Sequence, residues 1–236
     1  DLQAAARLQR SVLPSASLAF SGYRADWMFL PSAYVSGDLL NYFALDSRHL
    51  AFYCIDVAGH GVSAAMLSLA VAREFLTGRI DERLLIVDGN IVAPHQVVAA
   101  LNRRFCLDNE EITSYFTLIY GFIDTQTGLG ALCQAGHPTP FIIRQDGDLR
   151  TVGLGGVPVG LFPQSEYQSS EFCLAPGERL YLYSDGISEC ENRAGELYGE
   201  TRLQQLLIAQ RRQPRSAVFQ CVERELVSWS QPESDG

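Results

Sequence analysis

Three apolar, strand-like stretches of this chain lead into an aspartate that stands beside or near glycine. The first ends in Ser36-Gly37-Asp38, the second in Asp56 followed by Gly59-His60-Gly61, and the third in Ser184-Asp185-Gly186. Glycine-containing turns let the backbone approach a bound ion closely, and aspartate supplies the carboxylate. Together the three signatures therefore predict strand ends that hold hard cations.

The apolar patterns predict strands early and late in the chain, with two helices between them and two more at the end. The expected strands are Ala19–Leu30, Asn41–Leu45, Leu50–Val57, Phe116–Ile123, Gly130–Gln134, Phe141–Arg144, Tyr167–Leu174 and Glu178–Ser184. The expected helices run from Ser63 to a stop near Gly78, and over Pro94–Leu107, Gly199–Ala209 and Ser216–Trp229. This order predicts an α+β fold with mainly antiparallel sheets, because strands and helices do not alternate as in a parallel sheet.

Composition and charge limit the class of protein and of partner. The chain has 236 residues, of which 47% are hydrophobic, enough for the core of one large domain. Its formal charge of −9 argues against nucleic acid or an anionic membrane as the main partner. Six scattered cysteines without a CxxC pair predict reduced thiols in a cytoplasmic protein. No stretch approaches the ~18 apolar residues that cross a bilayer, so we expect no membrane insertion.

The amino terminus predicts an amphipathic helix over Leu2–Leu13 that ends before Pro14. One stripe of this helix either pairs with another helix or packs on its own domain, and it consists of Leu2, Ala5, Leu8, Gln9 and Val12. Because the chain starts in mid-helix without methionine, we expect a piece of a longer protein. We assign residues 1–18 to a linker or regulatory helix and residues 19–236 to one domain.

Aspartate in the three signatures suits magnesium or manganese. Both ions prefer carboxylate and water oxygens, and they keep several waters while taking one or two protein carboxylates. Two adjacent ions can therefore share one aspartate and hold a hydroxide-like water between them. Asp56 is the candidate for the shared ligand. Each signature alone also fits an ordinary solvated turn, and it is the presence of three in one domain that favours a metal site.

Seven motifs in a fixed order carry a family resemblance. They are SGD, DVAGHGVSAAMLS, YFTLIYGFID, QAGHPTPFIIR, GGVPVGLF, PGERLYLYSDGISE and GELYG. In this order they resemble the SpoIIE-type bacterial branch of the metal-dependent, type 2C-like protein phosphatases (the PPM family). The opening AARLQRSVLP resembles the helix that precedes this domain in bacterial members. The resemblance covers nearly the whole chain and implies two packed, mainly antiparallel sheets flanked by helices, an α-β-β-α sandwich.

The resemblance also implies the roles of individual residues. Asp38 matches a ligand of one metal, and Asp56 matches the aspartate that bridges two metals. The backbone carbonyl of Val57 matches a ligand of the second metal, and Asp185 matches a further metal ligand. Glu189 ends the same motif as Asp185 and receives no catalytic role. Two Mn²⁺ or Mg²⁺ ions are therefore the expected cofactors.

The chain departs from the family pattern in four places. Ser36 stands where the family has the first glycine of Gly-Gly-Asp, and Asn41 stands where a second aspartate is usual. Asn41 keeps an oxygen acceptor but loses the charge, which predicts weaker outer support for the metal. Gln134 replaces the asparagine of an Asn-Ala-Gly-His-Pro element, a change that we expect to be structural. The end of the chain, Glu233-Ser234-Asp235-Gly236, does not match the closing Asp-Asp-x-Thr strand, so we expect the last strand and its metal aspartate to be missing.

Two histidines stand within these motifs. His60 lies between glycines at the predicted metal turn, where it either supports the metal site and transfers protons or fixes the shape of the turn. His137, before Pro138, is interpreted as structural. Neither histidine has the surroundings of a phosphoryl-accepting nucleophile.

The predicted function is hydrolysis of phosphoserine or phosphothreonine in a protein, by in-line attack of a metal-activated water on phosphorus. The resemblance implies a phosphorylated STAS-type anti-sigma-factor antagonist as substrate, in bacterial partner switching. We expect an upstream receiver or sensory domain of the same polypeptide to act through the first helix, by dimerisation and by moving the helix after Gly61. Two other classes stay open: a docking module with little turnover, motivated by Asn41 and the missing strand, and a hydrolase of small phosphoesters.

Overall fold

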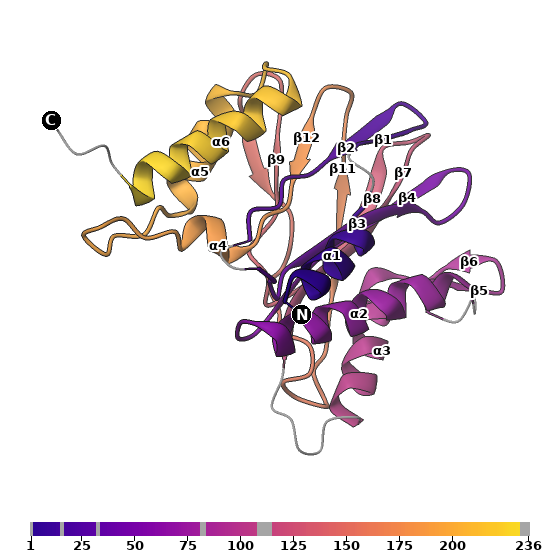
Figure 1. Cartoon of the computed structure of the whole chain (residues 1–236). Helices are drawn as coiled ribbons and strands as arrows, with labels where there is room; N and C mark the ends of the chain where they lie inside the picture. Colours follow the sequence, from indigo (N-terminus) through magenta and orange to yellow (C-terminus); the bar gives the residue numbers. More distant parts are fainter. Residues whose placement is uncertain (1, 15–16, 32–33, 81–83, 108–114, 232–236) are drawn as a thin grey trace, which may run out of the picture. The chain divides into compact units, whose positions relative to one another are not determined.

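The computed structural model describes residues 2–14, 17–31, 34–80, 84–107 and 115–231 (Figure 1). The chain divides into two compact units. Unit 1 consists of Asp1–Thr139 and Val152–Cys173, and unit 2 consists of Pro140–Thr151 and Leu174–Gly236. The aspartates of the first two signatures belong to unit 1, and the aspartate of the third belongs to unit 2.

Unit 1 is built on a five-stranded antiparallel sheet in the order β11-β8-β7-β4-β3. Its strands are β3 (Leu39–Ala44), β4 (His49–Val57), β7 (Phe116–Asp124), β8 (Leu129–Ala135) and β11 (Ser169–Cys173). The central pair, β4 and β7, is buried along most of its length. Buried strands in the middle of a sheet need apolar side chains at nearly every position. This explains why the almost continuous apolar run Leu50–Ile55 forms a strand.

Two helices of unit 1 pack against this sheet (Figure 1). They are α2 (Val62–Ile80), which contacts β4 and β3, and α3 (Pro94–Leu107), which contacts β7 and β8. Phe75 of α2 is 1% exposed, and its ring stacks on Tyr53 at 4.3 Å and on Tyr120 at 5.4 Å between centroids. Such aromatic pairs add about 0.5–1.5 kcal/mol each beyond the burial of area. This stack fixes α2 over the two central strands.

The expected strand Ala19–Leu30 is wrong in its length. The structure has a hairpin instead, β1 (Ser17–Phe20) and β2 (Tyr23–Asp26). The two residues between the strands, Ser21 and Gly22, have φ angles of 47° and 87°. A two-residue turn with both φ angles positive matches the twist of an antiparallel pair, and this turn interrupts the apolar run.

Several short elements were not among the predicted ones. A second hairpin joins β5 (Ile86–Val87) to β6 (Asn90–Ile91) through Asp88-Gly89, whose φ angles are 49° and 76°. The helix expected to stop near Gly78 ends close to it, at Ile80. A single glycine costs a helix only about 1 kcal/mol relative to alanine, so it does not end the helix by itself.

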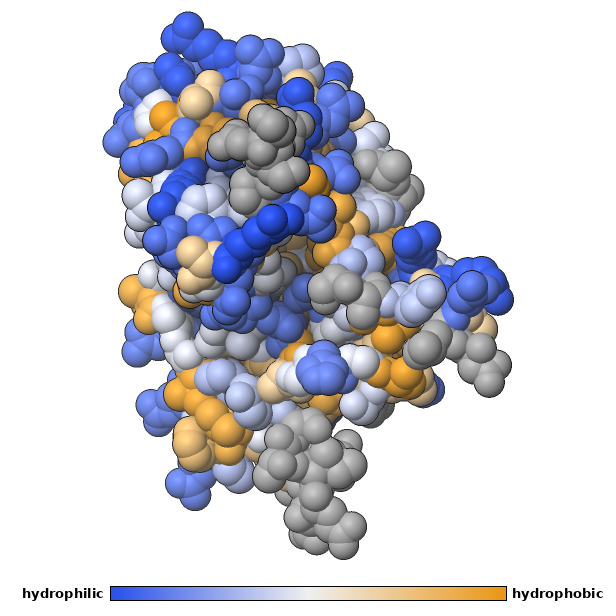
Figure 2. Space-filling model, turned by 60° about the vertical axis from the view of Figure 1, so that its left-hand side comes forward, coloured by the Kyte–Doolittle hydropathy of each residue, from blue (hydrophilic) through white to orange (hydrophobic). Residues whose placement is uncertain are grey.

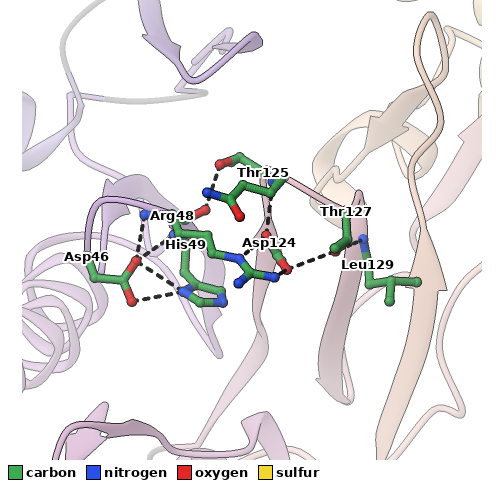
Figure 3. A network of polar contacts seen from close by, with 8 residues as sticks. Asp46, Arg48, His49, Asp124, Thr125, Thr127 and Leu129 are labelled. Carbon is green, nitrogen blue, oxygen red and sulfur yellow. Dashed lines mark hydrogen bonds and ion pairs between the residues drawn. The ribbon is translucent and has the colours of Figure 1, made fainter.

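A polar network joins the β3–β4 turn to the end of β7 (Figure 3). The guanidinium group of Arg48 donates to both carboxylate oxygens of Asp124, at 2.7 Å from Nε to Oδ1. Thr127 Oγ1 donates to Asp124 at 2.8 Å, and Thr125 Oγ1 donates to the carbonyl of Arg48 at 2.6 Å. The network locks the register in which His49 faces Asp124 and Asp56 faces Thr117. Asp124 and Asp56 therefore belong to opposite ends of this strand pair.

In its described residues, unit 2 has a three-stranded antiparallel sheet in the order β10-β9-β12 and three helices. The elements are β9 (Phe141–Ile143), β10 (Leu149–Thr151), β12 (Arg179–Tyr181), α4 (Asp185–Ser188), α5 (Glu200–Ala209) and α6 (Arg215–Ser230). The strand β10 and the short helix α4 were not predicted, since both are shorter than a period that an apolar pattern can reveal.

The predicted class, α+β with mainly antiparallel sheets and flanking helices, is confirmed. Among the helices that the structure describes, none is both long and apolar enough to cross a membrane. The surface in Figure 2 carries separate hydrophobic areas among hydrophilic residues.

The boundary between residues 1–18 and 19–236 stays a prediction, although α1 (Leu2–Val12) packs against α2 within unit 1. The helix thus packs on its own domain, and Leu8 of its stripe is 54% exposed.

Candidate active site

Asp38 immediately precedes β3, and Asp56 lies near the end of the neighbouring strand β4. The last pair of the β3–β4 ladder is Leu39 with Ile55, so the next step of the same register sets Asp38 opposite Asp56. The backbone N–H of Val57 donates to the carbonyl of Gly37 at 3.4 Å, which continues the ladder by one more step. Side chains at facing positions of an antiparallel pair lie on one face, with Cβ atoms about 4.5–5.5 Å apart. Two of the predicted ligands are therefore neighbours.

Gly37 lets this close approach happen. A Cβ atom on Gly37 would lie 2.7 Å from the carbonyl oxygen of Val57 and 3.3 Å from its nitrogen. Cβ atoms do not approach backbone oxygen so closely without displacement of one chain. Glycine is thus required beside Asp38 by the position of Val57, whose carbonyl is itself a predicted metal ligand.

The chemistry around Cys54 agrees with this placement. Cys54 precedes Asp56 by two residues and therefore lies on the same face of β4. Burial raises the pKa of the Cys54 thiol, and the negative charges of Asp38 and Asp56 raise this pKa further. Both carboxylates act on one thiol, as expected of side chains that share a face of the sheet.

Asp38 is held by a local turn. The hydroxyl of Ser36 accepts a hydrogen bond from the N–H of Asp38 at 3.1 Å and donates to Asp38 Oδ2 at 3.3 Å. Serine at this position therefore adds a contact that the usual glycine of the family lacks. On the outer side, Gln9 of α1 binds the backbone of both Ser36 and Asp38.

Asp56 is supported from β7. Thr117, its cross-strand partner, donates from Oγ1 to the Asp56 carbonyl at 3.4 Å. The same hydroxyl lies 2.8 Å from Nδ1 of His137, which is 2% exposed. This buried position beside Thr117 of β7 agrees with the structural role that the sequence predicts for His137. Sequence reasoning missed Thr117, because only the register of β4 and β7 makes it the neighbour of Asp56.

The turn after Asp56 has the backbone that its glycines predict. Gly59 and Gly61 have φ angles of 97° and 82°, in the region that favours glycine. The carbonyl of Gly61 accepts the N–H of Ala65, so it belongs to the first turn of α2. His60 between them is exposed. Its role in proton transfer or in shaping the turn stays a prediction.

Asn41 binds the first helix. Its Nδ2 donates to the carbonyl of Val12, near the end of α1, at 3.2 Å, and its Oδ1 accepts the N–H of Tyr42 at 2.8 Å. An aspartate in this place has no proton to donate to the carbonyl of Val12. The departure from the usual aspartate is therefore accounted for by a contact between β3 and α1.

Asp185 stands in unit 2, at the first residue of α4. Its carbonyl accepts the backbone N–H of Glu189 at 2.7 Å and the hydroxyl of Ser188 at 3.1 Å. The end of this segment is tied to α5 and α6, because Gly199 donates to the Ser188 carbonyl at 2.8 Å and Trp229 Nε1 donates to that of Cys190 at 3.0 Å. The backbone that carries Asp185 is thus anchored within unit 2.

The donors of unit 1 fit a divalent cation. Like charges at facing positions of a sheet are destabilising, and a cation between them converts the repulsion into attraction. Within the described residues, no group of three or more histidine, cysteine, aspartate or glutamate side chains forms a cation site. Magnesium nevertheless usually takes only one or two carboxylate ligands from a protein and keeps several water ligands.

Comparison with known proteins identifies the family. The sequence model described as Stage II sporulation protein E (SpoIIE) matches residues 46–235. Protein IcfG of Synechocystis sp. is 26% identical over 244 residues, covering 96% of this chain and 38% of IcfG. Phosphoserine phosphatase RsbP of Bacillus subtilis is 27% identical over 192 residues, covering 80% of this chain and 45% of RsbP. The chain thus spans less than half the length of either relative.

A solved structure shows the same fold. The SiaA-PP2C domain of Pseudomonas aeruginosa superimposes with a TM-score of 0.79 over 98% of this chain and 90% of that domain, at 19% identity. The family match includes Asp56, Val57 and Asp185, whereas Asp38 precedes its first residue. Because the match covers most of the sequence, this chain belongs to the SpoIIE family, and its fold is that of PP2C phosphatase domains.

Proposed function

We propose that this chain is a metal-dependent phosphatase that hydrolyses phosphoserine or phosphothreonine in a protein. The facing pair Asp38 and Asp56, in a chain of the SpoIIE family, carries the proposal. The relative RsbP is named a phosphoserine phosphatase, which supports the same reaction. The confirmed family resemblance supports the ligand set that it implies.

The residues of the chain hold the cations and orient them. Asp38, Asp56, the carbonyl of Val57 and Asp185 would be the metal ligands, with Asp56 shared between two ions. When bound, two Mg²⁺ or Mn²⁺ ions supply Lewis-acid activation of water and neutralise phosphate charge. Gly37 and Ser36 hold the loop of residues 36–38 against Val57. Asp38, Asp56 and the Val57 carbonyl are therefore positioned without a bound metal ion.

The proposed substrate is a phosphorylated STAS-type anti-sigma-factor antagonist in the cytoplasm of a bacterium. The implied pathway is partner switching, with an upstream receiver or sensory domain that acts through α1. The family membership supports this pathway, and the packing of α1 on α2 supports a route from the first helix to the site.

The test is release of phosphate from such a phosphoprotein by the full chain as Mn²⁺ is titrated. Asp56→Asn and Asp185→Asn should each lower the rate more than about 100-fold, since even residues that only support metal ligands change affinity or activity by about 10–100-fold. Asp88→Asn removes the same charge from an exposed hairpin turn and should leave the rate unchanged.

Other outcomes would select other functions. Wild-type rates in both Asp56→Asn and Asp185→Asn would sink the assignment. Calorimetry that detects no Mn²⁺ binding to the wild-type chain would favour the docking module. Comparable rates on the phosphoprotein and on p-nitrophenyl phosphate would favour a hydrolase of small phosphoesters.

A further inference from the structure

One loop of unit 1, residues 154–162, exposes three large apolar side chains, and we call it the apolar loop. Leu154 is 65% exposed, Leu161 is 41% exposed and Phe162 is 57% exposed. Residues 152–165 include no charged side chain, so the apolar groups are not interspersed with solvated charges. Single exposed apolar residues need no explanation, whereas a group of them is typical of an interaction site.

Two buried side-chain amides hold the apolar loop. Asn102 of α3 accepts the N–H of Gly160 at 2.8 Å and donates to the carbonyl of Phe162 at 2.9 Å. Near the start of the loop, Gln134 of β8 accepts the N–H of Gly155 at 2.9 Å. Both amides are buried, so breaking these bonds would leave polar groups without partners in the core. The loop is therefore anchored near both ends while its apolar side chains stay exposed.

The middle of the apolar loop pairs with a strand end beside the predicted metal ligands. Val159 and Phe116 of β7 exchange two backbone hydrogen bonds, at 2.8 and 3.0 Å. Phe116 is also the cross-strand partner of Val57, which follows Asp56 on β4. Neighbouring strands lie about 4.8 Å apart, so two such steps set the loop backbone about 10 Å from that of Val57. The loop thus borders the predicted metal site within one compact unit.

This position matters because a phosphorylated side chain is short. A protein that brings its phosphate to Asp56 also covers the surface beside this strand end. The formal charge of the chain is −9, so its net charge does not attract a phosphoprotein. Burial of one leucine or phenylalanine side chain strengthens binding about 10-fold or more. Apolar contact is therefore the source of affinity that this loop offers.

We propose that the apolar loop is the docking surface for the phosphoprotein substrate, and that Leu161 and Phe162 contact an uncharged, apolar patch beside its phosphorylated residue. The proposal rests on the proposed function, because the docked protein is the one whose phosphate the metal site hydrolyses. Asn102 and Gln134 act through the loop, since they hold its backbone and do not themselves reach the partner. The loop sets which phosphoproteins are substrates, and the metal ligands set the reaction.

The experiment compares two substrates of the full chain in the presence of Mn²⁺, a phosphorylated STAS-type antagonist and p-nitrophenyl phosphate. The small ester reports on the metal site without the surface of a protein. The ratio of the two kcat/KM values, phosphoprotein over ester, should fall about 10-fold in Leu161→Ser and in Phe162→Ser, through a higher KM for the phosphoprotein. The matched control is Leu129→Ser, a 59% exposed leucine at the other end of β8 from Gln134, which should keep the wild-type ratio.

Binding without metal gives a second readout that does not depend on turnover. Calorimetry with the same phosphoprotein and the metal-free chain should show a dissociation constant about 10-fold higher in both loop variants and unchanged in Leu129→Ser. If the wild-type chain shows this pattern of binding but releases no phosphate with Mn²⁺, the proposed function fails and the docking surface stands.

Four outcomes would overturn the docking surface. They are wild-type ratios and dissociation constants in both loop variants, equal effects of Leu129→Ser, equal losses on the phosphoprotein and the small ester, and no binding of the phosphoprotein by the wild type. Sedimentation tests a different occupant. A wild-type dimer that Phe162→Ser converts to a monomer would assign the apolar loop to a second copy of this chain, and it would overturn the proposal as well.

Discussion

Gly37 is packed closely against Val57, beside the predicted metal ligand Asp38. A Cβ atom here would lie 2.7 Å from the carbonyl oxygen of Val57. We expect Gly37→Ala to push the Asp38 loop away from β4. The change should cost about 1–3 kcal/mol of unfolding free energy, as overpacking does. It should also weaken Mn²⁺ binding, which calorimetry measures.

Gly121→Ala is the matched control for this steric effect. Its Cβ atom would lie 2.7 Å from the carbonyl oxygen of Ala131, in the middle of β7 and β8. It should lower stability to a similar extent while the folded protein keeps its Mn²⁺ affinity. Equal losses of affinity in both variants would mean that Gly37 matters only for the fold.

At the scale of elements, α6 anchors the segment that carries Asp185. Trp229 Nε1 of α6 donates to the Cys190 carbonyl at 3.0 Å. The centroids of the Trp229 and Tyr198 rings lie 5.8 Å apart. The guanidinium of Arg202, from α5, lies 4.5 Å from the centroid of the Trp229 ring. One indole therefore joins two helices to the loop that follows α4.

We expect Trp229→Phe to lower the unfolding free energy of the full chain by about 1–2 kcal/mol. The hydrogen bond contributes about 1 kcal/mol, and the contact with Arg202 weakens because phenylalanine attracts cations less than tryptophan does. Denaturant unfolding measures the loss. Val227→Ala changes a 57% exposed position of the same helix and should stay within about 0.5 kcal/mol of the wild type. A loss that small for Trp229→Phe would contradict the anchor.

At the scale of the whole molecule, the Arg48–Asp124 pair makes stability depend on pH. The hydrogen bonds from Arg48 hold the pKa of Asp124 well below its ordinary value, with help from Gln126 and Thr127. An unfolded chain protonates this carboxyl near pH 3.9. Because the folded pKa is depressed, the contribution of the charged Asp124 is complete above about pH 5 and is lost as pH falls through the folded pKa.

Asp124→Asn should therefore be less stable than the wild type at pH 7, and the difference should shrink progressively below about pH 4. Denaturant unfolding at several pH values measures both curves. Asp88→Asn removes one carboxylate from an exposed turn and should change the unfolding free energy at pH 7 by no more than about 0.5 kcal/mol. A gap between wild type and Asp124→Asn that does not narrow in acid would contradict the role of the pair.

Much of the fold was predictable because the signals are local. Strand runs such as Leu50–Val57, the helix that starts at Pro94 and the turn glycines all depend on residues close in sequence. The errors arose where short-range patterns are ambiguous. The turn at Ser21-Gly22, for example, lies inside an apolar run. Elements of two to four residues, such as β5 and α4, are too short to show a period.

The sequence by itself determined which residues are candidate ligands, since Asp38, Asp56 and Asp185 stand in motifs that need no structure to be found. Only the tertiary structure decided how two of them meet, because the register that sets Asp38 opposite Asp56 depends on pairing between separate strands. The tertiary structure also decided the hydrogen bonds of Gln9, whose backbone partners lie 27 and 29 residues away in the sequence. Such contacts arise when an edge strand leaves backbone groups that a side chain from a distant helix must satisfy.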